Sequence, residues 1–229
     1  MKKAYFITGT DTGVGKTLVT SALLHAFARH GSKVVGMKPV AAGCEATSRG
    51  LSCADVELLL AHSNLAAPLR LVNPYALAPA IAPHIAAQQE GVEIDLDTLV
   101  SSCAALREMA DVVLVEGVGG FMVPLNASQD TADLAVKLGL PVILVVGMRL
   151  GCINHALLTA LAIRLKGLRL AAWVANRIDP AMNAFDENLH ALETRLAAPL
   201  LGVVPCLAKA AAVSAAEYMD LNILNPIQE

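Results

Sequence analysis

Short runs of apolar, mostly β-branched residues recur along the chain, and stretches with a helical pattern separate them. The runs lie at Ala4–Thr8, Val34–Lys38, Val112–Glu116, Val142–Gly147, Leu170–Ala175 and Leu201–Pro205. None of them alternates apolar with polar side chains, which indicates strands buried on both faces. Helices between such strands imply right-handed crossovers that cover both faces of a parallel sheet. The sequence therefore predicts an α/β fold built on a doubly wound, mostly parallel sheet.

The stretches between these runs carry the apolar spacing of helices. The expected helices are Lys16–His30, Asp55–His62, Leu96–Ala110, Thr131–Leu138, Asn154–Lys166 and Asp186–Ala197. Residues 68 to 83 hold four prolines, so we expect an irregular crossing there, and residues 208 to 229 are ambiguous. No repeat, low-complexity tract or linker divides the 229 residues, and we expect a single domain over residues 1–229.

Composition and charge narrow the class of protein. Apolar residues make up 55% of the chain and charged residues 16%, which suits a sheet buried on both faces or a large subunit interface. The longest apolar run, Leu138–Met148, is interrupted by glycine and proline and is shorter than the ~20 residues of a spanning helix. The net charge is −3 and no lysine and arginine cluster exists to hold a phosphate backbone. We therefore expect neither a membrane span nor a nucleic-acid partner.

The start of the chain and its cysteines indicate the compartment. The first apolar stretch ends at Thr8 and Gly9, too short for the core of an export signal. The five cysteines, at positions 44, 53, 103, 152 and 206, form neither a disulfide framework nor a zinc-binding pattern. We interpret them as small buried apolar residues and expect a cytoplasmic protein.

A phosphate-binding loop follows the first expected strand. Residues 9–17 read GTDTGVGKT and open a helix, so their backbone N–H groups can hold phosphate oxygens. Lys16 would reach the outer phosphates, and the Thr17 hydroxyl would bind Mg²⁺. The strict motif would place its first glycine at Thr10, whereas the glycine is Gly9. The alternative is a glycine-rich turn with an incidental lysine.

Two carboxylates lie where the sheet should end. Glu116 closes a buried strand and is followed by Gly117, Gly119 and Gly120, which allow a ligand to approach the backbone closely. A carboxylate there can hold Mg²⁺, although a solvated acid at a strand end is the alternative. Asp55 opens a helix shortly after the second strand, and a metal ligand or an N-terminal cap explains it equally well.

A lysine and an amide follow other strands. Lys38 precedes Pro39, which holds it extended at the sheet edge, where it would stabilise a developing negative charge or simply be solvated. Asn176 follows the run Leu170–Ala175, where it would pair with an adenine edge or form a turn. Gly151–Asn154 leads into a helix and would offer N–H groups to an anion, or be an ordinary helix start.

Taken in order, these segments make the sequence resemble the dethiobiotin synthetase family. The segments that carry the resemblance are Thr8–Thr17, Lys38–Ala41, Asn73–Tyr75, Pro83–His84, Val115–Gly117, Leu150–His155 and Trp173–Asn176. The match keeps its order from residue 5 to about residue 207, and the spacing of the phosphate loop is the family's own form. The resemblance implies a fold of the P-loop NTPase type.

The resemblance also implies a reaction and an assembly. 7,8-Diaminopelargonic acid takes up CO₂ as a carbamate, ATP phosphorylates the carbamate to a mixed anhydride, and the second amine closes the ring of dethiobiotin. ADP and phosphate are released. The family requires ATP and Mg²⁺ and forms a homodimer with active sites at the subunit interface.

Residue roles follow from the same resemblance. Lys16 and Lys38 would stabilise the transferring phosphoryl group and the carbamate, and Thr12 would contact the carbamate. The metal ligands would be Thr17, Asp55 and Glu116. The nucleotide contacts would be Gly13, Val14, Gly15, Lys16, Thr17, Leu18, Asp55, Glu116, Gly117, Val118, Gly119, Asn176, Arg177, Pro205, Cys206 and Leu207. The substrate contacts would be Thr12, Ala42, Gly151, Cys152, Ile153 and Asn154, and the helix start among them would hold the substrate carboxylate from the partner subunit.

Three positions depart from the family's pattern. Gly13 stands where other members carry an acid beside the nucleotide, and Ala42 stands where a serine contacts substrate. A carboxylate expected near position 212 is absent, because residues 210–212 are all alanine. These departures concern nucleotide and substrate contacts rather than the chemistry.

Two alternatives remain. A related amide-forming P-loop enzyme, such as a cobyrinic acid diamide synthase, needs a glutaminase nucleophile and a second domain, and neither is evident. A regulatory ATPase of the chromosome-partitioning or division-site type would carry an extra lysine early in the loop, where this chain has Thr10, Asp11 and Thr12.

Overall fold

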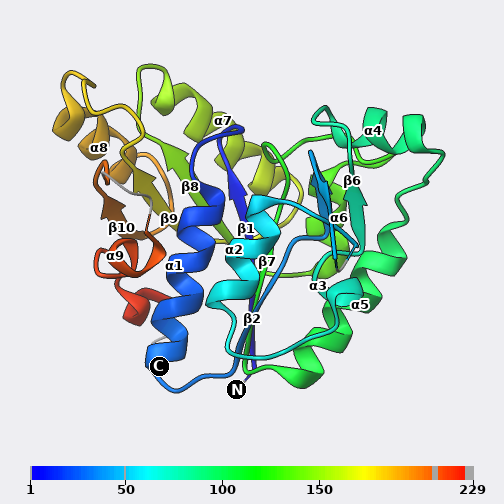
Figure 1. Ribbon diagram of the computed structural model, residues 1–229. Helices are drawn as coiled ribbons and strands as arrows, with labels where there is room; N and C mark the ends of the chain where they lie inside the picture. The colour runs from blue at the N-terminus through cyan, green and yellow to red at the C-terminus, as the bar shows by residue number, and fades with distance from the viewer. Residues whose placement is uncertain (1, 49, 208–210, 225–229) are drawn as a thin grey trace.

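The computed structural model describes residues 2–48, 50–207 and 211–224, and its centre is a six-stranded sheet (Figure 1). Every pair of neighbouring strands in it is parallel, which confirms the expected fold class. From edge to edge the strands are β10 (Leu200–Val204), β9 (Leu170–Asn176), β8 (Val142–Gly147), β1 (Lys3–Gly9), β7 (Val112–Glu116) and β2 (Val34–Met37).

The strands show no polar alternation because both faces of the sheet are buried. In β1, Phe6 belongs to one apolar core, whereas Tyr5 and Ile7 belong to the other. Phe6 pairs with Val115 of β7 on one side and with Val142 of β8 on the other, so β1 lies in the interior of the sheet. Two hydrophobic cores, one on each face, are what a doubly wound sheet requires.

Helices cover both faces (Figure 1). One core contains the apolar residues of α1 (Lys16–Arg29), such as Leu23 and Phe27, and those of the short α9 (Ala212–Ala216). The helix α2 (Ala54–His62) packs against α1 and β2. The other core contains residues of α5 (Leu96–Met109), α6 (Thr131–Leu138), α7 (Cys152–Leu165) and α8 (Phe185–Glu193).

The segment from residue 40 to residue 90 is more ordered than the sequence predicts. The expected irregular crossing contains α3 (Leu69–Val72) and β6 (Tyr75–Leu77), so that prediction is wrong in part. Strand β6 pairs in parallel with β3 (Val40–Ala42). Strands β4 (Glu45–Thr47) and β5 (Gly50–Ser52) form an antiparallel pair. These strands of three residues are too short to show a period. Helix α4 (Pro83–Glu90) begins at one of the four prolines from which we expected an irregular crossing.

Several boundaries also differ from the prediction. Helix α7 begins at Cys152, two residues before the expected start, and α8 ends at Glu193 rather than at residue 197. Part of the ambiguous C-terminal stretch forms α9 and a 3₁₀ helix, Leu221–Leu224, while residues 208–210 and 225–229 lie outside the described part of the chain. Within the described residues no helix is long and apolar enough to cross a membrane. The extent of the domain, residues 1–229, stays a prediction.

Candidate active site

The phosphate loop connects β1 to α1 at the carboxyl edge of the sheet. Gly13 and Gly15 have φ values of 75° and 91°, which a residue with a side chain adopts only with strain. Gly15 is the N-cap of α1, and no side chain caps that helix. The first N–H groups of α1 therefore point toward the loop and are available to an anion.

Lys16 is buried beneath this loop rather than projecting into solvent. Only 7% of its surface is exposed, and its Nζ donates to the carbonyl oxygen of Asp11 at 2.9 Å. A Cβ added to Gly9 would lie 3.1 Å from the Lys16 side chain, so glycine makes room for the lysine stem. Burial, followed by the charge of Lys38, lowers the pKa of Lys16 to about 8. Lys16 therefore takes part in the packing beneath the loop.

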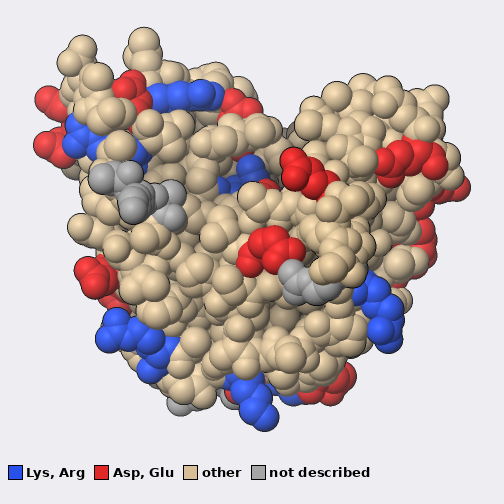
Figure 2. Space-filling view, in the orientation of Figure 1, with Lys and Arg blue, Asp and Glu red and all other residues tan. Residues whose placement is uncertain are grey.

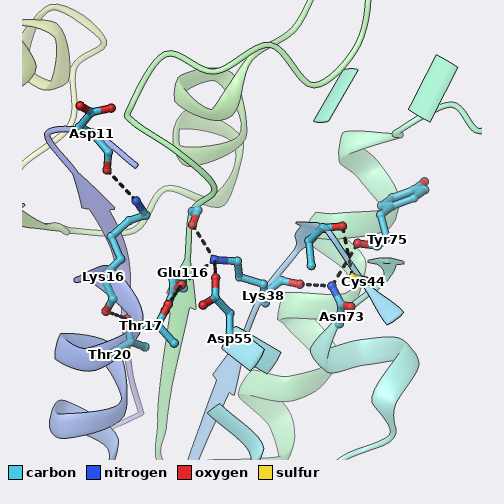
Figure 3. Close-up of polar contacts among 12 residues, drawn as sticks. Asp11, Lys16, Thr17, Thr20, Lys38, Cys44, Asp55, Asn73, Tyr75 and Glu116 are labelled. Atoms are coloured by element: carbon cyan, nitrogen blue, oxygen red, sulfur yellow. Dashed lines mark hydrogen bonds and ion pairs between the residues drawn. The ribbon is translucent and has the colours of Figure 1, made fainter. Parts of the chain in front are cut away.

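Lys38 follows β2 and lies between two carboxylates (Figure 3). Its Nζ lies 2.6 Å from Glu116 Oε1 and 2.9 Å from Asp55 Oδ2, and it donates to the Gly117 carbonyl at 3.3 Å. Only 3% of the residue is exposed, so the solvated alternative is wrong. Burial lowers the pKa of Lys38, but Glu116 and Asp55 together outweigh it and hold the pKa above its ordinary value.

Glu116 is fully buried at the end of β7, so the alternative of a solvated strand end is wrong. Its Oε1 accepts from Thr17 Oγ1 at 2.8 Å as well as from Lys38. Its Oε2 is buried and has no hydrogen-bond partner. A buried carboxylate oxygen without a partner is costly, which indicates that a bound cation or donor completes this site.

Asp55 belongs to the first turn of α2 but does not cap it. The N-cap is Cys53, so the capping alternative is wrong. The Asp55 side chain is 44% exposed and faces Lys38. Burial raises its pKa, but the Lys38 ammonium, a hydrogen bond from Thr17 and the charge of Lys16 together outweigh burial, and the pKa lies below its ordinary value. Asp55 thus stays ionised beside the loop.

These groups form a set of oxygen donors suited to Mg²⁺. Thr17, Asp55 and Glu116 contribute a hydroxyl and two carboxylates from three different elements, and the unpaired Glu116 Oε2 offers a ready donor. Mg²⁺ is usually held by one or two carboxylates together with substrate phosphates, rather than by a full cage of side chains. In keeping with this, no group of three or more His, Cys, Asp or Glu residues that could hold a metal occurs among the described residues.

A cavity of about 750 Å³ opens above the carboxyl ends of these strands. In Figure 2 the molecule is hollowed at this edge, and lysine or arginine atoms lie at the bottom of the hollow. The cavity is lined by Thr12, Gly13, Gly15, Lys16, Thr17, Lys38, Ala41, Ala42, Cys53, Asp55, Ala80, Ile81, Ala82, Pro83, Val118, Gly119 and Val123. Glu116, Gly117 and Val14 are buried behind this lining, and Leu18 lies one residue further along α1.

Asn176 closes β9 and supports the phosphate loop from below. Its Nδ2 donates to the Val14 carbonyl at 2.8 Å, and a Cβ on Gly15 would collide with the same nitrogen. Asn176 is the last residue of the strand rather than part of a turn, so the turn alternative is wrong. Beyond it, the Arg177 guanidinium lies 4.7 Å from the centre of the Phe185 ring. Residues 205–207 follow β10, and among them Cys206 is exposed.

The start of α7 does not reach the cavity of its own chain. Gly151 is its N-cap with φ 95° and no side chain caps the helix, although the Cys152 N–H donates to the Arg149 carbonyl at 3.0 Å. The N–H groups of Ile153 and Asn154 remain for an anion. None of residues 151–154 lines the cavity. Cys152 is buried, Ile153 is partly buried, and Asn154 is exposed. The structure therefore does not bring this segment together with the phosphate loop.

Comparison with known proteins identifies the family. The model of a family described as an AAA domain matches residues 3–214. The ATP-dependent dethiobiotin synthetase BioD of Nitrosospira multiformis is 62% identical over 205 residues, covering 90% of this chain and 89% of the relative. BioD of Aromatoleum aromaticum is 59% identical over 208 residues, covering 91% and 92%. The chain belongs to the dethiobiotin synthetase family. It is thus an ATP-dependent ligase of biotin biosynthesis.

Solved structures share the fold of this synthetase at low identity. MinD in the MinC:MinD cell division complex of Aquifex aeolicus matches with a TM-score of 0.59 and 17% identity, covering 93% of this chain and 86% of that one. The cell division ATPase MinD of Pyrococcus furiosus matches with a TM-score of 0.55 and 18% identity, covering 95% and 98%. Such identities show a common P-loop NTPase fold and nothing about activity, so they give no support to the division-site alternative.

Sequence patterns did not predict the roles of several residues at the site. Asp11 pairs with Arg149 at 2.7 Å and so ties the phosphate loop to the β8–α7 connection. Asn73 donates to the Lys38 carbonyl at 2.7 Å and fixes the backbone from which Lys38 projects. Only the family resemblance singled out Asn73, and no pattern in the sequence pairs Asp11 with Arg149. The interpretation of all cysteines as buried is wrong for Cys53 and Cys206.

Proposed function

We propose that the chain converts 7,8-diaminopelargonic acid and CO₂ to dethiobiotin, releasing ADP and phosphate from ATP. The observation that carries this is Lys38, a buried cation held at the cavity wall between the phosphate loop and the surface formed by Ala41 and Ala42. The regulatory ATPase type would carry its extra lysine early in the loop, whereas Lys38 follows β2 and reaches Glu116 beside the loop. We place the reaction in the cytoplasm.

The phosphate loop would hold the nucleotide. Backbone N–H groups of residues 13–18 would bind the phosphates, and Lys16 would leave the Asp11 carbonyl to contact the outer ones. Gly117, Val118 and Gly119 would pass close to the nucleotide. The adenine would lie toward Asn176, Arg177 and residues 205–207, beyond the loop on the β9 side of the sheet.

Thr17, Asp55 and Glu116 would hold Mg²⁺. Bound there, the ion neutralises charge on the phosphates as the phosphoryl group moves. The same carboxylates hold Lys38 in this structure. The ion and the lysine would therefore share ligands. Binding of Mg²⁺ would weaken the ion pairs of Glu116 and Asp55 with Lys38. The lysine is then more available to an anionic substrate.

Lys38 would act on the carbamate. A carbamate oxygen attacks the terminal phosphorus of ATP, and the resulting anhydride is then attacked at its carbonyl carbon by the second amine, with phosphate leaving. Lys38 would hold the carbamate oxygens and stabilise the charge that shifts between them and phosphorus. Thr12, which lines the cavity, would contact the same group, whereas Ala42 provides no side-chain hydrogen bond.

The substrate carboxylate would be bound by a second copy of the chain. Its binding segment, Gly151–Asn154, lies apart from the cavity of its own chain. Beside it α7 presents an apolar surface: Leu150, Leu158, Leu161 and Leu165 are 93%, 57%, 45% and 78% exposed. An exposed apolar helix face of this kind is typical of a subunit interface. We therefore propose a homodimer in which each cavity is completed by the α7 start of the other subunit.

A turnover assay with omissions tests the proposed function. Purified protein is incubated with 7,8-diaminopelargonic acid, bicarbonate and MgATP, and dethiobiotin and ADP are measured. We expect both products in equal amounts, and none when the diamine or Mg²⁺ is left out. An equal rate of ATP hydrolysis with and without the diamine would support a regulatory ATPase instead. A requirement for glutamine would support the amide-forming alternative.

A further inference from the structure

Cys44 and Cys53 occupy opposite positions beside the cavity. Cys44 follows β3 and directly precedes β4, and Cys53 directly follows β5. Strands β4 and β5 pair in antiparallel register with Glu45 opposite Ser52, so Cys44 and Cys53 occupy the next opposite positions. Opposite positions on an antiparallel pair bring Cβ atoms to about 4.5–5.5 Å, close to the separation that a disulfide spans.

The two cysteines differ in exposure. Burial, followed by the neighbouring Cys53, raises the pKa of Cys44 to about 12. The Cys44 residue is 4% exposed, and its Sγ lies 3.7 Å from the Ala41 carbonyl oxygen. Cys53 is partly exposed and lines the cavity. A reagent that enters the cavity therefore meets Cys53 first.

We propose that Cys44 and Cys53 form a reversible disulfide by exchange with a low-molecular-weight disulfide such as oxidised glutathione. The Cys53 sulfur attacks the glutathione disulfide, breaks its S–S bond and releases one glutathione thiol. The Cys44 sulfur then attacks the Cys53 sulfur of the mixed disulfide and releases the second. Two protein thiols are oxidised, one disulfide is reduced to two thiols, and the two protons pass to the released glutathione.

The disulfide would change the active site through α2. Cys53 is the N-cap of α2, and Asp55 lies in the first turn of that helix with its carboxylate 2.9 Å from Lys38. A disulfide holds its Cβ atoms about 3.5–4.5 Å apart, closer than opposite positions on an antiparallel pair, so the two backbones must approach each other. A shift at Cys53 moves Asp55 relative to Lys38. We therefore expect the oxidised form to turn over several-fold more slowly.

Mass spectrometry tests the disulfide whatever the reaction of the protein is. The folded protein is incubated with oxidised glutathione, alkylated and digested. We expect a peptide pair joined between Cys44 and Cys53, lost again on treatment with dithiothreitol. Cys44→Ser should stop at a stable glutathione adduct on Cys53, Cys53→Ser should leave Cys44 as a free thiol, and Cys103→Ser should behave like the wild type. A folded wild type that keeps both thiols free, or that stops at the Cys53 adduct, overturns the proposal.

The coupling to activity rests on the proposed function and has its own test. Turnover of the oxidised wild type and of oxidised Cys53→Ser is each compared with its own reduced form, so that any adduct on the exposed Cys206 affects both alike. We expect a several-fold loss that dithiothreitol reverses in the wild type only. An unchanged rate with the disulfide present contradicts the coupling to Asp55. Failure of the reduced wild type to make dethiobiotin would contradict the proposed function. The disulfide would then be tested by mass spectrometry alone.

Discussion

Lys38 is a positive charge held where water is excluded, and three oxygens keep it there. Glu116, Asp55 and the Gly117 carbonyl bind its ammonium group, while Asn73 fixes its backbone. Lys16, in contrast, lies under the phosphate loop, and its ammonium group donates only to the Asp11 carbonyl among the described residues. The two lysines therefore differ in position and, in our account, in role.

Lys38→Ala and Lys16→Ala should separate these roles. Loss of Lys38 should lower turnover by about 10²–10³-fold with little change in MgATP affinity, because its charge acts on the transition state. Loss of Lys16 should lower turnover by a similar factor and weaken nucleotide binding as well. Nucleotide titration and kcat measurements on both variants check this. Equal losses of nucleotide affinity in the two variants would make Lys38 a nucleotide-binding group.

The Lys38 variant also leaves Glu116 buried without its cation. Such a loss is strongly destabilising, so its folding must be checked by circular dichroism. Mg²⁺ should recover part of the lost thermal stability, because the ion would bind the carboxylates that Lys38 has vacated.

Glu116→Gln tests the metal site. A neutral amide is a poorer ligand for a hard cation, so the Mg²⁺ concentration for half-maximal turnover should rise several-fold. The matched control is Glu187→Gln, an exposed change on α8 that should leave the Mg²⁺ titration unaltered. A Glu116→Gln titration curve that overlays the wild type would reduce Glu116 to a partner of Lys38 and Thr17.

At the scale of elements, the regular strands and helices were predictable and the segment beside the site was not. The buried strands of the sheet and the helix after the phosphate loop follow from long apolar patterns. Strands β3 to β6 have three residues each; β3 pairs with the distant β6, and β4 pairs with the neighbouring β5. Cys44 and Cys53 are brought opposite each other by the pairing of β4 with β5, which explains why the sequence showed no cysteine pair. The burial of Lys16 and Lys38 likewise depends on the folded sheet edge.

The start of α7 provides a test at this scale. Ile153→Pro removes one N–H group from the uncapped helix start, at a position where proline is compatible with a helix. We expect the KM for 7,8-diaminopelargonic acid to rise several-fold while nucleotide affinity is unchanged, and Asn154→Ala should act in the same direction. Asn183→Ala, at an exposed site before α8, is the matched control. A normal KM in Ile153→Pro would remove this helix start from the substrate site.

At the scale of the whole molecule, each active site of the proposed homodimer is built from two chains. Homodimers of Lys16→Ala and of Ile153→Pro should each be impaired, and mixing them should restore activity. In a mixed dimer one of the two sites combines an intact phosphate loop with an intact α7 start. Native mass spectrometry verifies that subunits have exchanged. Complete exchange without recovery of turnover would mean that each site is built within one chain.

In the proposed reaction this cavity transfers a phosphoryl group to a carbamate. In that reaction a carbamate oxygen becomes the bridging oxygen of the anhydride and leaves with phosphate. The measurement is a short incubation with oxygen-18-labelled CO₂ in unlabelled water, before the label exchanges, followed by mass spectrometry of the phosphate. We predict that oxygen-18 appears in inorganic phosphate in step with dethiobiotin formation. Dethiobiotin formed together with unlabelled phosphate would contradict the account.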